Sequence, residues 1–164
     1  MTNDALTSAR NTLKTEAAGL QKLAESIGDE ITAAVDMLAK AEHRVIVSGM
    51  GKSGHIANKV TATMASTGTP AQFVHPAEAS HGDLGMITTN DVILALSWSG
   101  GTSELGGLLT YARRFNIPLI AITSNPDSLL GSSADICLTL PKTEEACPNG
   151  LAPTTSTTMQ LALG

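Results

Sequence analysis

Apolar side chains recur at intervals of three and four over roughly the first forty residues, which is the period of an amphipathic helix. Gly28 and Asp29 interrupt this pattern. We therefore predict two amphipathic helices that meet at this break. Their apolar positions are Leu6, Ala9, Leu13, Ala17, Leu20, Ala24, Ile31, Val35 and Leu38.

The rest of the chain alternates apolar runs of strand length with segments of helix length. The strand-like runs cover residues 44–48, 71–75, 91–97, 117–123 and 135–140. The helix-like segments include residues 53–66 and 103–115. Repeated strand–helix–strand units form parallel sheets whose two faces are both covered. The pattern predicts an α/β three-layer sandwich with a mainly parallel five-stranded sheet.

Length and composition narrow the class of protein further. The chain has 164 residues and no internal repeats, so we expect a single domain over residues 1–164. Aromatic residues make up only 2%, so the core must consist of aliphatic side chains. The net charge is -5 and Lys and Arg do not cluster, which argues against a nucleic-acid partner. The start of the chain has no signal-peptide pattern and no run is long enough to span a bilayer, so we expect a cytoplasmic protein without a membrane partner.

The two cysteines, Cys137 and Cys147, have neither metal-ligand nor redox spacing, and we interpret both as reduced thiols.

The turn after the first strand contains glycines at 49, 51 and 54, the spacing of a dinucleotide-binding loop. The second strand ends in Val74-His75-Pro76 and lacks the acidic residue that holds a nicotinamide cofactor's ribose, so this reading is weak. A nucleotide-hydrolase phosphate loop would need glycine where Ile46 stands. Lys52 and Ser53 beside a helix N-terminus instead suit an anionic or hydroxylated ligand. A tight turn with a solvated lysine is the simpler alternative.

The turn after the third strand, residues 97–104, carries the most specific pattern in the chain: Ser-Trp-Ser-Gly-Gly-Thr-Ser-Glu. Free amides at a helix start favour an anion, and glycines let the backbone approach phosphate oxygens. Hydroxyl groups that can donate to a phosphate belong to Ser97, Ser99, Thr102 and Ser103. A capped helix alone would explain three of these residues but not the others. The pattern favours a metal-independent phosphate cradle, with Glu104 in the first helical turn.

The motif Ser-x-Ser-Gly-x-Thr-x-Glu after a strand resembles the signature of the sugar isomerase (SIS) domain, a fold of the flavodoxin and Rossmann kind. Further motifs are similar to those of D-arabinose 5-phosphate isomerases, and the similarity covers about residues 5–164. These motifs lie at residues 49–54, 66–70, 75–79, 81–86, 145–148 and 151–154.

The resemblance implies interconversion of D-ribulose 5-phosphate and D-arabinose 5-phosphate through an enediol, in Kdo and lipopolysaccharide biosynthesis. It implies catalytic roles at Lys52, Glu104 and Glu145. We take Glu104 first as the base, because it starts a helix beside the predicted cradle, and Glu145 stays an alternative. Substrate contacts are implied at Ser53, Gly68, Thr69, His75 and His81 as well as in the hydroxyl-rich turn.

The resemblance also implies a homotetramer in which each pocket is completed by a neighbouring subunit. The His75 position is described as a zinc site in the family. One histidine does not supply the three or four ligands that zinc needs, so we expect no required cofactor and at most an inhibitory zinc. A hydrogen-bonded structural histidine, and a helix-capping glycine at 68, are the simpler alternatives at those two positions.

The chain departs from the family in two places. Trp98 stands where relatives carry a small polar residue, so its indole either narrows the sugar pocket or packs outward at a subunit contact. The chain stops at Gly164 within an apolar stretch, and we interpret this as truncation within the last helix. Relatives continue with a catalytic histidine in a His-Pro-Gly-Gly segment and a pair of CBS modules. The alternative function is therefore a non-catalytic, sugar-phosphate-binding regulatory SIS module, with a dehydrogenase third.

Overall fold

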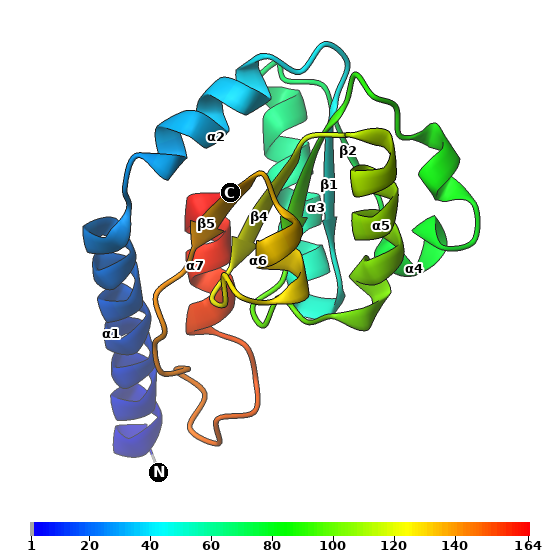
Figure 1. Ribbon diagram of the computed structural model, residues 1–164. Helices are drawn as coiled ribbons and strands as arrows, with labels where there is room; N and C mark the ends of the chain where they lie inside the picture. The colour runs from blue at the N-terminus through cyan, green and yellow to red at the C-terminus, as the bar shows by residue number, and fades with distance from the viewer. Residues whose placement is uncertain (1) are drawn as a thin grey trace.

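Five parallel strands form one sheet in the order β2-β1-β3-β4-β5 (Figure 1). The structure is a computed structural model that describes residues 2–164. The strands are β1 (Val45–Gly49), β2 (Ala71–Phe73), β3 (Val92–Leu96), β4 (Leu119–Thr123) and β5 (Ile136–Thr139). All five predicted strands are confirmed. Strand β2 is shorter than predicted because Pro76 begins a helix and cannot donate to a strand ladder.

The helices agree with the predicted periodicity. They are α1 (Thr2–Ser26), α2 (Glu30–Ala39), α3 (Gly51–Ser66), α4 (Pro76–Ala79), α5 (Gly106–Phe115), α6 (Leu129–Ser133) and α7 (Thr155–Leu163). Two 3-10 turns, η1 (Asp83–Met86) and η2 (Ser103–Leu105), complete the set. The predicted break near Gly28 separates α1 from α2.

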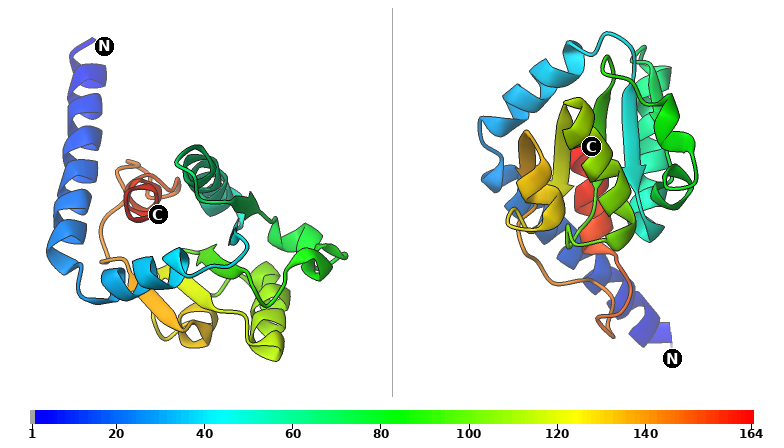
Figure 2. Two further views of the ribbon diagram at one scale, coloured as in Figure 1. Left: turned by 90° about the horizontal axis from the view of Figure 1, so that it is seen from above. Right: turned by 45° about the vertical axis from the view of Figure 1, so that its right-hand side comes forward.

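Helices cover both faces of the sheet, as predicted (Figure 2). Alternate residues of each strand point to opposite faces. Val45 and Val47 of β1 face a core shared with α1, α2, α3 and α7, whereas Ile46 faces a core shared with α4, α5 and α6. The result is the three-layer α/β sandwich expected from the sequence.

Strands β1 and β3 are neighbours, although the chain visits β2 between them. From β1 the chain runs through α3 to β2 on one side, and from β3 it runs through α5 to β4 on the other. In open parallel sheets, a crevice opens at the carboxyl ends of two neighbouring strands from which the chain leaves in opposite directions, as it does at β1 and β3. Both turns that the sequence analysis singled out begin there.

Residues 141–154 form an irregular segment between β5 and α7, and α1 packs against α7 (Figure 1). Figure 2 shows α7 lying between α1 and α3 on one face of the sheet. This segment and α7 bring Glu145 and the hydroxyl-rich start of α7 to the crevice at β1 and β3. None of the helices in the described residues is both long and apolar enough to cross a membrane.

Candidate functional site

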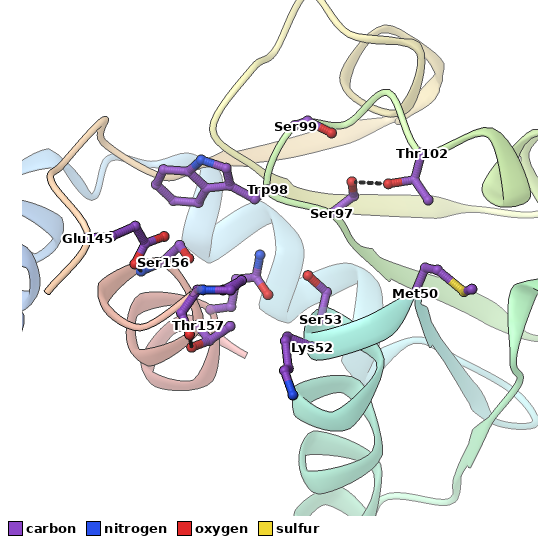
Figure 3. Close-up of a pocket in the computed structure, with 12 residues that line it drawn as sticks. Met50, Lys52, Ser53, Ser97, Trp98, Ser99, Thr102, Glu145, Ser156 and Thr157 are labelled. Carbon is purple, nitrogen blue, oxygen red and sulfur yellow. Dashed lines mark hydrogen bonds between the residues drawn. The ribbon is translucent and has the colours of Figure 1, made fainter. Parts of the chain in front are cut away.

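A cavity of about 290 Å³, most of whose lining residues have polar side chains, lies at the carboxyl ends of β1 and β3 (Figure 3). Its walls come from the β1–α3 turn, the turn after β3, the segment before α7 and the first turns of α7. The residues lining it are Met50, Lys52, Ser53, Ser97, Trp98, Ser99, Thr102, Glu145, Pro153, Ser156, Thr157 and Gln160. The cavity therefore unites six of the residues predicted from the sequence: Lys52, Ser53, Ser97, Ser99, Thr102 and Glu145.

The turn after β3 is held in shape by its own hydroxyl groups. The Oγ of Ser97 lies 2.8 Å from Oγ1 of Thr102 and accepts a hydrogen bond from the amide of Gly100 at 3.1 Å. The amide of Gly101 donates to Oγ of Ser99 at 3.3 Å. These bonds fix the turn before any ligand arrives. A fixed array of hydroxyls and amides at a helix start suits a phosphate group.

Gly100 is required by both backbone conformation and space. Its φ is 66°, a left-handed value that side chains rarely adopt. A Cβ there would collide with the Ser128 side chain and lie 2.8 Å from Oγ1 of Thr123. The turn therefore packs directly on the end of β4 and the start of α6.

The β1–α3 turn presents Lys52 and Ser53 on the first turn of α3. Gly51, with φ of 57°, lets the chain reverse sharply into the helix. The Lys52 side chain is exposed at the mouth of the cavity (Figure 3). A cation and free helix amides in the same turn favour a negatively charged ligand.

Glu145 reaches the cavity from the segment before α7 and is held by the start of that helix. Its Oε2 accepts hydrogen bonds from the amide of Thr154 at 2.7 Å, the hydroxyl of Thr154 at 3.0 Å and the amide of Ser156 at 3.2 Å. Burial acts to raise the pKa of Glu145, but hydrogen bonds from Ser156 and Thr154 outweigh it and the pKa lies below its ordinary value. The carboxylate is therefore ionised at neutral pH.

Ser103 and Glu104, also predicted as site residues, do not line this cavity. Glu104 is exposed, and its Oε2 accepts a hydrogen bond from the Ser103 hydroxyl at 2.8 Å. The pKa of Glu104 is lowered, first by its own backbone amide, then by Ser103 and by the nearby His75. Within one chain, Glu145 and not Glu104 meets the predicted phosphate cradle across the cavity.

The remaining predicted residues lie elsewhere in the fold. Gly68 and Thr69 connect α3 to β2 at the amino edge of the sheet, the opposite edge from the cavity. His75 precedes α4 and His81 follows it, beyond the end of β2. Within one chain these four residues do not join the cavity.

His75 occupies the position at which the family resemblance implies a zinc site. Its Nδ1 is buried without a hydrogen-bond partner in the described part of the chain. No three His, Cys, Asp or Glu side chains gather within residues 2–164 to hold a metal ion. The ligands of one chain therefore do not suffice for zinc, and no step below uses a metal.

Trp98, for which the sequence left two orientations open, lines the cavity and packs against the core, as expected if its indole narrows the pocket. Other cavity residues were missed by the sequence analysis. Ser156, Thr157 and Gln160 line the cavity from α7. The run of hydroxyl residues at 154–158, at the start of a predicted helix, was a usable signal for two of them.

Comparison with known proteins agrees with this architecture. The chain is 51% identical over 161 residues to arabinose 5-phosphate isomerase KdsD of Pseudomonas aeruginosa, covering 98% of this chain and 49% of that protein. The chain thus spans about half the length of the curated relatives it matches.

Solved structures share the fold. A protein of E. coli CFT073 in complex with A5P superposes with a TM-score of 0.94 at 36% identity, covering 99% of this chain and 86% of that one. The NanR protein of Vibrio vulnificus, complexed with ManNAc-6P, has a TM-score of 0.79 at 21% identity and shares the fold, covering 98% of this chain and 59% of that one. The SIS domain model matches residues 37–164. The chain therefore belongs to the SIS-domain family.

Proposed function

We propose that the chain is the catalytic domain of an aldose–ketose isomerase that interconverts D-ribulose 5-phosphate and D-arabinose 5-phosphate through an enediol. The single observation that carries the proposal is one cavity in which an ionised carboxylate, Glu145, faces a hydroxyl-rich phosphate cradle with Lys52 at its mouth. The names of the relatives and the A5P-bound structure support the same substrate.

Electrostatics orient such a substrate. Its phosphate carries close to two negative charges and is repelled by Glu145 but attracted by Lys52 and by helix N-termini. Figure 3 shows the Ser97–Thr102 pair and Glu145 on different sides of the cavity. The phosphate then occupies the cradle, and the carbonyl end of the sugar extends toward Glu145.

Isomerisation moves a proton between C1 and C2. Glu145 takes the proton from the carbon next to the carbonyl and returns it to the other carbon, while a hydroxyl proton moves between the two oxygens. Lys52 stabilises the negative charge that develops on the enediolate oxygen. A positioned base contributes about 10²–10⁴-fold in rate, so its loss is easily measured.

The other family-based roles remain part of the proposal. Glu104, Ser103, His75 and His81 lie outside this chain's own cavity, so we assign them to the pocket of a neighbouring subunit in a homotetramer. The protein would act in the cytoplasm, in lipopolysaccharide biosynthesis, without a required cofactor.

The test is conversion of D-arabinose 5-phosphate to D-ribulose 5-phosphate, with calorimetric binding measured in parallel. Glu145→Gln keeps the shape of the side chain and removes its charge. Glu144→Gln is the matched control, because Glu144 is an exposed neighbour outside the cavity. We expect Glu145→Gln to lower kcat at least about a hundredfold and the control to keep it.

Each other outcome has a definite meaning. Binding without turnover would support the alternative, a sugar-phosphate-binding regulatory module, and contradict the isomerase assignment for this chain. If the chain neither binds nor converts arabinose 5-phosphate, this sugar phosphate is excluded as its ligand. Equal turnover of both variants would exclude Glu145 as the base.

A further inference from the structure

Gln160 lies on α7 and is completely buried, with 0% of its surface exposed. Neither Nε2 nor Oε1 of its carboxamide has a hydrogen-bond partner among residues 2–164. A carboxamide offers two N–H donors and an acceptor oxygen. Burying these groups without hydrogen bonds disfavours folding. Packing alone therefore does not explain a glutamine at this position.

The helical period places Gln160 on the cavity face of α7. It follows Thr157 by three residues and Ser156 by four, and both of these line the cavity, as Gln160 itself does. Side chains on a helix lean toward its N-terminus. The N-terminus of α7 is the end that holds Glu145. The carboxamide therefore belongs to the floor of the cavity.

The other polar groups of the cavity differ in this respect. Ser97 pairs with Thr102, Glu145 is bonded by Thr154 and Ser156, and the Thr157 hydroxyl donates to the carbonyl of Thr154 at 2.8 Å. Among the described residues that line the cavity, Gln160 is the one whose side chain holds buried polar atoms without a partner. The cavity thus contains one unmet donor and acceptor pair.

We infer that Gln160 recognises the hydroxyl groups of the sugar part of the substrate by hydrogen bonds, in which Nε2 donates and Oε1 accepts. This inference rests on the proposed function, because a sugar phosphate brings neighbouring hydroxyls that each donate and accept. A phosphate oxygen without a proton cannot donate to Oε1. The three side-chain torsions of glutamine let the buried carboxamide turn toward the bound sugar. Gln160 is then a specificity-determining residue that distinguishes a sugar phosphate from phosphate alone.

The experiment compares Gln160→Leu with Met159→Leu. The first substitution removes donor and acceptor with little change in size, and the second perturbs the neighbouring buried residue of α7, which does not line the cavity. Calorimetry measures the affinity of each variant for D-arabinose 5-phosphate and for inorganic phosphate, and thermal unfolding without ligand gives Tm. Gln160→Met, unbranched like glutamine, repeats the test if the leucine variant does not fold.

We expect Gln160→Leu to lower the affinity for D-arabinose 5-phosphate at least about tenfold, the effect of losing one or two hydrogen bonds. Affinity for inorganic phosphate should change less than about twofold. The Tm without ligand should stay equal or rise, since a buried unsatisfied carboxamide is removed. Met159→Leu should keep both affinities.

Three results would overturn the inference. The first is unchanged affinity for the sugar phosphate. The second is an equal loss of both affinities together with a lower Tm, which would mean a structural role for Gln160. The third is a wild-type chain that binds phosphate but no sugar phosphate, and this result would first overturn the proposed function itself.

Discussion

The Oε2 atom of Glu145 accepts hydrogen bonds from both the amide and the hydroxyl of Thr154, at 2.7 and 3.0 Å. The same hydroxyl oxygen accepts a hydrogen bond from the amide of Ala146 at 2.8 Å. One threonine side chain thus joins the two ends of the segment between Glu145 and α7. The position of the proposed base is set by a residue that does not itself line the cavity.

Replacement of Thr154 by valine should loosen this segment. The variant keeps the shape of the side chain but loses two hydrogen bonds, so we expect the free energy of unfolding to fall by about 1–3 kcal/mol. Urea unfolding measures this change. Thr158→Val is the control, because Thr158 is a half-buried threonine of α7 that lies outside the cavity and does not bind Glu145. Equal losses in the two variants would contradict the role given to Thr154.

Gly100→Ala should be strongly destabilising, whereas Gly101→Ala should be nearly neutral. Alanine at 100 must adopt a φ of 66° and meet the Ser128 side chain, so we expect a loss of about 2–5 kcal/mol. A Cβ at Gly101 meets nothing within 4 Å, so Gly101→Ala should change the free energy of unfolding by no more than about 0.5 kcal/mol. Thermal or urea unfolding of both variants checks the contrast. A mild effect at Gly100 would show that the turn relaxes.

Asp91 should contribute to the free energy of unfolding at neutral pH and lose this contribution in acid. Its side chain is 0% exposed and lies 3.2 Å from Nε of Arg44. Burial acts to raise the pKa of Asp91, but Arg44 and Thr88 outweigh it, and the pKa lies below its ordinary value. Because the folded pKa is the lower one, this stability is present above the unfolded pKa of about 4 and is lost as the pH falls through the folded pKa.

Asp91→Asn should therefore remove stability at neutral pH and flatten the acid side of the profile, measured as urea midpoints between about pH 3 and 7. Asp127→Asn is the matched control, because Asp127 is exposed and its carboxylate forms no ion pair with the described residues. A profile of Asp91→Asn parallel to the wild type would refute this assignment.

Cys147 should react with alkylating reagents at lower pH than an ordinary thiol. Backbone amides of Ala152, Leu151 and Asn149 lower the pKa of Cys147. In a Cys137→Ser background Cys147 is the remaining thiol, and we expect its alkylation rate by iodoacetamide to rise with a midpoint below that of a free cysteine thiol measured in parallel. Mass spectrometry follows the reaction. A midpoint at or above that value would show that the loop opens in solution.

The sequence by itself determined the layers of this protein and the edge of the sheet that carries the site. Its apolar runs have the length of buried strands, and their alternation with helices leaves little choice but a covered parallel sheet. The local conformation of turns rich in glycine and hydroxyl residues can be predicted from their composition. The sequence could therefore propose an anion-binding role for Lys52 and another for the turn with Ser97 and Thr102, and the fold brings both to one cavity.

Only the tertiary structure showed that Glu145 lines the cavity and Glu104 does not, and only it revealed Gln160. Where a side chain of a short 3-10 turn lies depends on how that turn packs. Glu145 and Gln160 come to the cavity because an irregular segment folds back and α7 packs between α1 and α3 on one face of the sheet. Such long-range packing has no periodic signal in the sequence, since it depends on contacts between residues far apart in the chain.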